Sequence, residues 1–360
     1  MVINAILIHQ NKGNFAYFYR QLNKNTKSLE MKMHELVGRF TSQLEEALEI
    51  GQKAVINKPK GTIRNVYVSG LGGSGIGGNF AQEFIRHEAK IPYVVGKSYD
   101  IPKWVGKNTL AIASSYSGNT EETLEAFDDM LKTGAKIICV SSGGKLIELA
   151  KKHGLDYIQV PSNWPSPRAC LGYSVVMQLT ILNKLRLISG KSLKQMASSI
   201  ALLKREEEDI KKRAMKVAGQ LENKIPVIYT TDRMESVAVR FRQQVNENAK
   251  MLCWHHVVPE MNHNELVGWK IPNADLAVVY FRNKDDYERN AVRIEINKTI
   301  IKNCTPNIIE LNSKGRNLIE RAMYFVHLGD WISCYLADLR KEDSIEVKAI
   351  DFLKGELGKL

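Results

Sequence analysis

The sequence has no apolar run long enough to span a bilayer, although 44% of its 360 residues are hydrophobic. The apolar residues Met1 to Ile8 lack the preceding basic stretch and the small-residue cleavage site of a signal peptide. The five cysteines are scattered and odd in number, which argues against a disulfide framework and favours a reducing compartment. These absences predict a cytoplasmic globular protein with no membrane partner.

Nucleic-acid motifs are also absent, although the formal charge is +12. A basic chain suits nucleic acid, an anionic surface or a small anion. Nucleic-acid binders usually cluster their basic residues, and no dense Lys/Arg block interleaved with aromatic residues occurs here. We therefore expect a small anionic substrate and no nucleic-acid partner; a generally basic surface is the plainer explanation.

The length suggests two domains. Residues 1–30 differ from the rest in being rich in Asn and aromatic residues, and we interpret them as a dispensable extension or an upstream start-codon artefact. From residue 65 onward short apolar runs alternate with helical patterns, and the same order recurs after a charged helix at 193–220. The pattern predicts an α/β fold of two doubly wound parallel sheets with helices on both faces, in residues 31–190 and 191–360.

A glycine-rich segment, Gly70–Gly78, joins a strand predicted at 66–69 to a helix predicted at 80–85. Glycines permit a tight turn, and their N–H groups can approach an anion at a helix N-terminus. The segment also fits the Gly-x-Gly-x-x-Gly pattern of dinucleotide sites, but the next strand ends in residues 94–97 (Val-Val-Gly-Lys), without an acid to hold a ribose. A phosphate loop, a dinucleotide site and a tight turn without a ligand all stay open.

A hydroxyl-rich segment, Ser114–Thr123, follows the strand predicted at 110–113. Ser115, Ser117 and Thr120 offer hydroxyls where the N–H groups of the next helix would face an anion. A helix cap needs only one hydroxyl, so three favour a binding site. Because ligands bind at the carboxyl ends of parallel strands, the two segments together predict one anion site.

The two segments carry a resemblance to a known domain. The motif Gly-Gly-Ser in the first segment, followed by Ser-x-Ser-Gly-x-Thr-x-Glu-Thr in the second, resembles the signature of the sugar isomerase (SIS) domain. Five later segments resemble the bifunctional phosphoglucose/phosphomannose isomerase family: residues 165–169 (Pro-Ser-Pro-Arg-Ala), 247–250 (Glu-Asn-Ala-Lys), 259–265 (Pro-Glu-Met-Asn-His-Asn-Glu), 327–331 (His-Leu-Gly-Asp-Trp) and 350–354 (Ile-Asp-Phe-Leu-Lys). The similarity extends from about Met33 to the end of the chain.

The resemblance implies an aldose–ketose isomerase that interconverts fructose 6-phosphate with glucose 6-phosphate and mannose 6-phosphate through a cis-enediolate. It implies no cofactor and no metal. Glu247 would move the proton between C1 and C2, and Arg168 would stabilise the enediolate. His263, contributed by the other subunit of a homodimer, and Lys354 would assist ring opening. The substrate phosphate would be bound by Gly73, Ser74, Ser115, Ser117 and Thr120.

These implied roles agree with elementary chemistry. Removal of a proton next to a carbonyl needs a positioned carboxylate, and a fixed guanidinium helps where negative charge develops on oxygen.

Val347 stands seven residues before Lys354, where phosphoglucose isomerases carry Gln and bifunctional relatives can carry Thr. Valine has about the volume of threonine, so it leaves room for both faces of the enediolate, but it lacks the hydroxyl.

Several alternatives remain at this point. Without the resemblance, Glu247 would be taken as a surface charge. Cys253, His255, His256 and His263 hint at zinc, but their spacing matches no closed structural zinc site. A regulator that binds a sugar phosphate through SIS domains without turning it over would need the phosphate segments only, and a nicotinamide-dependent oxidoreductase would bind its cofactor.

Overall fold

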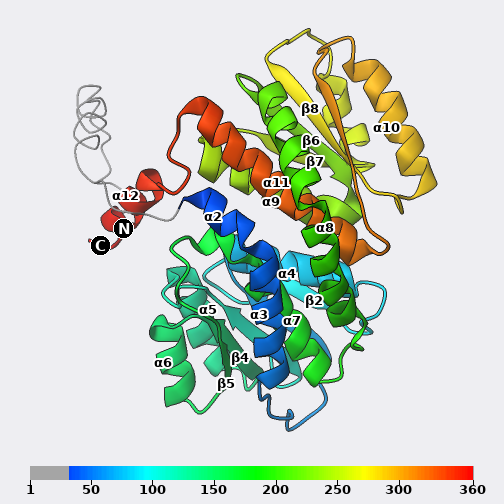
Figure 1. Ribbon diagram of the computed structural model, residues 1–360. Coiled ribbons are helices and arrows are strands. Elements are labelled where there is room, and N and C mark those ends of the chain that lie inside the picture. The colour runs from blue at the N-terminus through cyan, green and yellow to red at the C-terminus, as the bar shows by residue number, and fades with distance from the viewer. Residues whose placement is uncertain (1–31, 360) are drawn as a thin grey trace, which may run out of the picture. The chain divides into compact units, whose positions relative to one another are not determined.

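The computed structural model describes residues 32–359, so the predicted extension over residues 1–30 lies outside the described residues. From Met33 onward the chain forms one compact unit. That unit contains two parallel β-sheets with helices around them, which confirms the predicted α/β fold (Figure 1). The boundary predicted between residues 190 and 191 stays a prediction, because the two sheets belong to a single unit.

The first sheet is five-stranded, in the order β2-β1-β3-β4-β5. Its strands are β1 (Asn65–Ser69), β2 (Tyr93–Gly96), β3 (Thr109–Ser114), β4 (Lys136–Ser141) and β5 (Asp156–Gln159). The central strand β3 is buried along its whole length, because helices cover both faces of the sheet. The continuous apolar run that predicted this strand reflects that burial.

Helices on opposite faces follow from the strand order. The helices of this part are α2 (Met33–Gly38), α3 (Phe40–Lys53), α4 (Gly72–Ile85), α5 (Glu121–Leu131), α6 (Gly144–Lys152) and α7 (Leu171–Lys184). On one face Phe127 of α5 and Leu146 of α6 pack against Tyr67 and Ala111 of the sheet. Because crossovers are right-handed and the order reverses between β1 and β3, α4 lies on the other face, where it packs against α7, and α7 against α3.

The second sheet repeats this order with four strands, β7-β6-β8-β9. Its strands are β6 (Ile225–Thr231), β7 (Trp254–Val258), β8 (Leu276–Arg282) and β9 (Ile308–Asn312). Its helices are α8 (Lys191–Leu221), α9 (Glu235–Ala249), α10 (Glu288–Ile301) and α11 (Leu318–Arg340). Ile294 and Ile301 of α10 pack on one face, while α11 packs against both α8 and α9. The repeated order supports the duplication that the order of elements predicted.

Short elements complete the chain. Within residues 32–359 four 3₁₀ turns occur in loops, namely η1 (Pro167–Ala169), η2 (Asp232–Met234), η3 (Glu260–His263) and η4 (Glu265–Gly268). The final helix α12 (Lys348–Leu357) has no buried residue.

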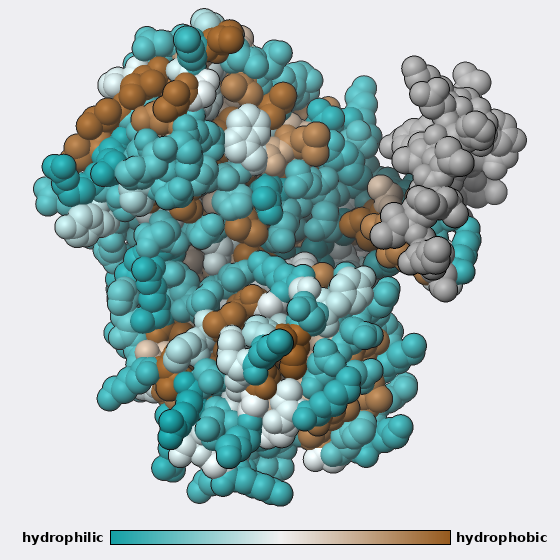
Figure 2. All heavy atoms as spheres, turned by 180° about the vertical axis from the view of Figure 1, so that it is seen from behind, coloured by the Kyte–Doolittle hydropathy of each residue, from teal (hydrophilic) through white to brown (hydrophobic). Residues whose placement is uncertain are grey.

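None of the helices described between residues 32 and 359 is both long and apolar enough for a membrane crossing. Figure 2 shows a mostly hydrophilic surface on the visible face, with apolar side chains in separate patches.

The predicted start of α4 is wrong, because the helix begins at Gly72 and not near residue 80. The glycine-rich segment is therefore mostly helix, and Gly73 and Ser74 lie in its first turn. Packing explains the glycines: a Cβ at Gly77 would lie 2.1 Å from Ser174 Oγ of α7. Glycine lets α4 and α7 approach closely. The same glycines make this segment look like a loop when the sequence is read alone.

Candidate active site

The two predicted anion segments meet at the point where the strand order of the first sheet reverses. β1 and β3 are paired neighbours, with Ser69 opposite Ala113 at their carboxyl ends. Ser74 follows β1 in the first turn of α4, and Thr120 is the residue before α5. The crevice at such a reversal is where open α/β sheets bind ligands. The structure therefore brings the two segments together, as the sequence predicted.

Hydrogen bonds hold the second segment in shape. The Ser115 and Thr120 hydroxyls lie 2.7 Å apart, and Ser117 Oγ accepts the N–H of Asn119 at 3.2 Å. Gly118 has φ +71°, and a Cβ there would lie 1.9 Å from Gly143 O, so only glycine fits. Thr120 makes no side-chain cap to α5, which leaves the first N–H groups of that helix without a hydrogen bond from its hydroxyl.

Arg168 lies against the glycine-rich segment. It belongs to η1, and a Cβ at Gly73 would come within 3.2 Å of Pro167 O. The arginine is only 7% exposed. Burial lowers the pKa of Arg168, and the nearby carboxylate of Glu247 opposes that effect. A guanidinium remains charged nonetheless, so the site keeps a fixed positive charge next to the two predicted anion segments.

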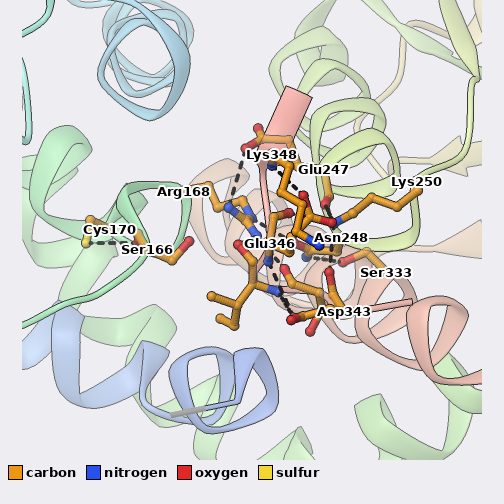
Figure 3. A network of polar contacts seen from close by, with 12 residues as sticks. Ser166, Arg168, Cys170, Glu247, Asn248, Lys250, Ser333, Asp343, Glu346 and Lys348 are labelled. Atoms are coloured by element: carbon orange, nitrogen blue, oxygen red, sulfur yellow. Dashed lines mark hydrogen bonds and ion pairs between the residues drawn. The ribbon is translucent and has the colours of Figure 1, made fainter. Parts of the chain in front are cut away.

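The Arg168 guanidinium joins three separate parts of the chain (Figure 3). Nε donates to Asn248 Oδ1 at 2.7 Å, and Nη2 donates to the carbonyls of Ser344 and of Ile345, the latter at 3.2 Å. Nη1 lies 3.6 Å from Glu247 Oε2. These bonds orient the guanidinium so that one nitrogen faces the Glu247 carboxylate.

Glu247 is presented by the last turn of α9. Its side chain is 31% exposed, so it is accessible to a substrate while lying beside a buried cation. The end of α9 is fastened to α11, because Asn248 Nδ2 donates to Ser333 Oγ at 2.9 Å and Arg240 donates to both oxygens of Asp330, at 3.1 and 2.8 Å. Glu247 is thus held on a rigid element, which a proton-transfer base requires.

The other two predicted catalytic residues are not brought to this pair within the chain. His263 lies in η3 beyond the edge strand β7, and Lys354 lies in α12; both are exposed. Among residues 32–359, no hydrogen bond or ion pair joins either of them to Arg168 or Glu247. Their predicted roles therefore depend on a rearrangement or on a second chain.

The residues that hinted at zinc point apart. Cys253 Sγ contacts the carbonyl of Arg242, His256 Nδ1 accepts the N–H of Val257 at 2.8 Å, and His255 faces Glu235. No group of three or more His, Cys, Asp or Glu side chains suited to a metal occurs within the described residues.

The corresponding crevice of the second sheet is filled by the chain itself. Asp286, in the loop after β8, accepts the Thr231 hydroxyl at 2.7 Å and the Asn283 N–H at 3.1 Å. Thr231 ends β6, the strand beside β8. A carboxylate therefore takes the position that an anionic ligand would take at this reversal, which leaves the first sheet as the candidate site.

Sequence reasoning missed three parts of the site: the side chains of Asn248 and Lys250, and the segment Asp343–Glu346. Asn248 and Lys250 lie within the Glu-Asn-Ala-Lys segment that carried the resemblance, and that was the available signal. The segment 343–346 contributes backbone carbonyls, which no side-chain pattern reveals.

Comparisons with known proteins agree with this geometry. Residues 210–357 match the family model described as the bacterial phospho-glucose isomerase C-terminal SIS domain. A bifunctional phosphoglucose/phosphomannose isomerase of Caldicellulosiruptor bescii is 39% identical over 91% of this chain and 99% of its own length. One of Aquifex aeolicus is 35% identical over 82% of this chain and 91% of its own. A putative phosphosugar isomerase structure from Clostridium difficile 630 superimposes with a TM-score of 0.72, at 15% identity, over 89% of this chain and 96% of its own, which shows a common fold.

Proposed function

Because the chain belongs to the bifunctional phosphoglucose/phosphomannose isomerase family, we propose that it interconverts fructose 6-phosphate with both glucose 6-phosphate and mannose 6-phosphate. The enzyme is an aldose–ketose isomerase. One observation carries the mechanism: Arg168 Nη1 lies 3.6 Å from Glu247 Oε2, and η1 packs against the phosphate segment at Gly73.

The phosphate of the sugar binds at the first crevice in this proposal. Its oxygens accept hydrogen bonds from the hydroxyls of Ser74, Ser115, Ser117 and Thr120 and from N–H groups at the starts of α4 and α5. Gly73 lines the segment because it allows close approach of the backbone. Binding the phosphate here anchors the other end of the sugar toward Arg168 and Glu247.

Glu247 acts as the base that carries the proton. From the open-chain ketose it takes a proton at C1 and returns it to C2 of the enediolate, while the proton of the C1 hydroxyl passes to the oxygen on C2, which gives an aldose. Negative charge develops on the carbonyl oxygen in this step, and the Arg168 guanidinium stabilises it from a fixed position. The bonds from Arg168 to Asn248 and to the backbone supply that fixed position before substrate arrives.

Ring opening requires proton exchange on the ring oxygen and the anomeric hydroxyl, and we assign it to His263 and Lys354. Histidine suits this step because its ordinary pKa is near neutrality. We propose that His263 comes from the other subunit of a homodimer, which agrees with its exposure in the single chain. Leu252, Val267 and Ile271, near His263 in the sequence, are 86%, 80% and 79% exposed, and a second copy of the chain would cover such apolar side chains.

Both aldoses arise if the enediolate can accept the proton on either face. Val347 supports this, since it occupies less space than the glutamine that phosphoglucose isomerases carry.

All five cysteines are unpaired, which supports our proposal of a reducing, cytoplasmic location.

The decisive experiment is to incubate the purified protein with fructose 6-phosphate and EDTA and to measure both aldose products. We expect glucose 6-phosphate and mannose 6-phosphate together, at a rate that the chelator leaves unchanged. Glucose 6-phosphate alone would refute dual specificity, and loss of all activity in EDTA would favour a zinc enzyme. Binding of the sugar phosphate with no product would instead indicate a non-catalytic regulator.

A further inference from the structure

Lys250 ends helix α9 in an uncommon backbone conformation. Its φ is 55° and its ψ 37°, the left-handed region, and its N–H bonds to Val245 O to cap the helix. Glycine is the usual residue at such a cap because it lacks a Cβ. Lys341 ends α11 in the same conformation, with φ 58° and ψ 34°, and its side chain is exposed. The two lysines therefore form a matched pair that differs in what the side chain contacts.

The side chain of Lys250 uses all three of its donors on backbone carbonyls. Nζ lies 2.6 Å from Glu247 O, 2.8 Å from Asp343 O and 2.8 Å from Glu346 O (Figure 3). An ammonium group has three N–H donors and no acceptor, so these contacts saturate it. Burial lowers the pKa of Lys250, and Glu346, Asp343 and Glu342 oppose the effect while Arg168 adds to it.

The segment Asp343–Glu346, which we call the strap, has every backbone carbonyl bonded to one of two cations. Lys250 binds the first and last of its carbonyls, and Arg168 binds the two between them, those of Ser344 and Ile345. The strap also bonds to itself, since Asp343 Oδ1 accepts the N–H of Ile345 at 2.9 Å. The catalytic cation and Lys250 thus hold one short segment from two sides.

The strap leads directly into the part of the chain that completes the proposed site. The residue after it is Val347, the position we associate with aldose choice, and α12 with Lys354 begins one residue later. Lys250 also binds the carbonyl of Glu247 itself. Any displacement of the strap would therefore move Val347 and Lys354 relative to the base.

We propose that Lys250 is a positioning residue for isomerisation, which ties the strap to the end of α9 and so sets where Val347 and Lys354 stand relative to Glu247. The catalytic consequence rests on the proposed function, whereas the attachment of the strap does not. Lys250 is not expected to touch substrate, because its three donors are occupied.

The test compares Lys250→Gly with the matched control Lys341→Gly. Both remove a lysine from a left-handed helix end where glycine fits, so the backbone of neither variant is strained. The first readout is hydrogen exchange of the Ile345 and Glu346 amides, and the second is kcat, KM and the ratio of the two aldoses from fructose 6-phosphate. Hydrogen bonds to a charged group are worth about 1.5–3 kcal/mol, so we expect changes of at least about tenfold.

In Lys250→Gly we expect hydrogen exchange of the strap amides to become at least about tenfold faster and kcat to fall at least about tenfold. KM should stay within about twofold, and the aldose ratio should shift. Lys341→Gly should match wild type in every readout. Asp343→Ala, which loosens the strap while keeping Lys250, should give the same kinetic pattern, and it carries the test if Lys250→Gly does not fold.

Unchanged strap exchange in Lys250→Gly would overturn the attachment. A loosened strap with unchanged kcat and aldose ratio would overturn the positioning role. An inactive wild-type protein would refute the proposed function, while the exchange measurement would still decide whether Lys250 holds the strap.

Discussion

Arg168 follows the first sheet and Glu247 belongs to a helix of the second, and Nη1 of the arginine lies 3.6 Å from Oε2 of the glutamate. The arginine lies in η1, and the glutamate lies in the last turn of α9. An enediolate bound beside this pair would contact the proposed base and a fixed cation together. The predictions below test this arrangement and the segments around it.

Replacing Glu247 with Gln keeps the shape of the side chain and removes its basicity. Loss of a general base typically costs about 10²–10⁴-fold, so kcat should fall by that factor while KM changes little. Glu235→Gln, at the other end of the same helix, is the control. Near-wild-type turnover of the Glu247 variant would transfer the role to Glu260 or Glu265, which flank His263.

Replacing Thr120 with Val removes the hydroxyl that lies 2.7 Å from Ser115 Oγ and faces the proposed phosphate. An unpaired buried acceptor costs about 1–3 kcal/mol, so KM for fructose 6-phosphate should rise about 5- to 150-fold, with a smaller effect on kcat. Stabilisation of the protein by inorganic phosphate against heat should weaken in parallel. Thr299→Val, on α10 away from the crevice, should leave both measurements unchanged, and equal affinity in the two variants would contradict the assignment.

Mixing two inactive variants tests the shared site. If His263 crosses to a neighbouring subunit, Glu247→Gln and His263→Ala chains together form dimers with one intact site. Activity should reappear after subunit exchange, up to about a quarter of wild type per site when the chains mix at random. Exchange shown by labelled subunits without any recovery would place both residues in one chain's site.

Asp286, the carboxylate that fills the second crevice, should give a characteristic pH dependence of stability. Burial raises the pKa of Asp286, and the hydrogen bonds from Thr231 and Asn283 only partly oppose this. A raised pKa means that the stabilisation by this group is present below its ordinary pKa and is lost as the pH rises through the raised value. The advantage of wild type over Asp286→Asn in urea unfolding should therefore be larger at acidic pH than at neutral pH. An advantage that grows with rising pH would contradict the direction of the shift.

Gly77 tests the close approach of α4 and α7. A Cβ there would lie 2.1 Å from Ser174 Oγ, and overpacking of this kind typically costs about 1–3 kcal/mol of unfolding free energy. Ser174→Ala in the same chain should recover part of the loss, because it removes the nearest atom. Gly61→Ala, which meets nothing within 4 Å, is the control.

Local pattern was sufficient for most of the fold. Apolar runs such as that of β3 predicted strands because a strand buried on both faces has no polar side to interrupt the run. The exceptions have physical causes. β7 was missed because an edge strand beginning Trp-His-His is only half-buried, and the start of α4 was misplaced because glycines that serve helix packing look like a loop.

The sequence by itself determined the α/β class and the two anion segments, because these depend on side-chain type and local spacing, and it named the residues proposed for catalysis only through the resemblance of short segments to a known family. Only the tertiary structure decided which of them meet. It placed Arg168 against Glu247 across two sheets, closed the second crevice with Asp286, and brought four strap carbonyls to two cations. Contacts between distant segments depend on packing in three dimensions, and backbone carbonyls are the same at every residue. Neither can therefore be predicted from the sequence of side chains.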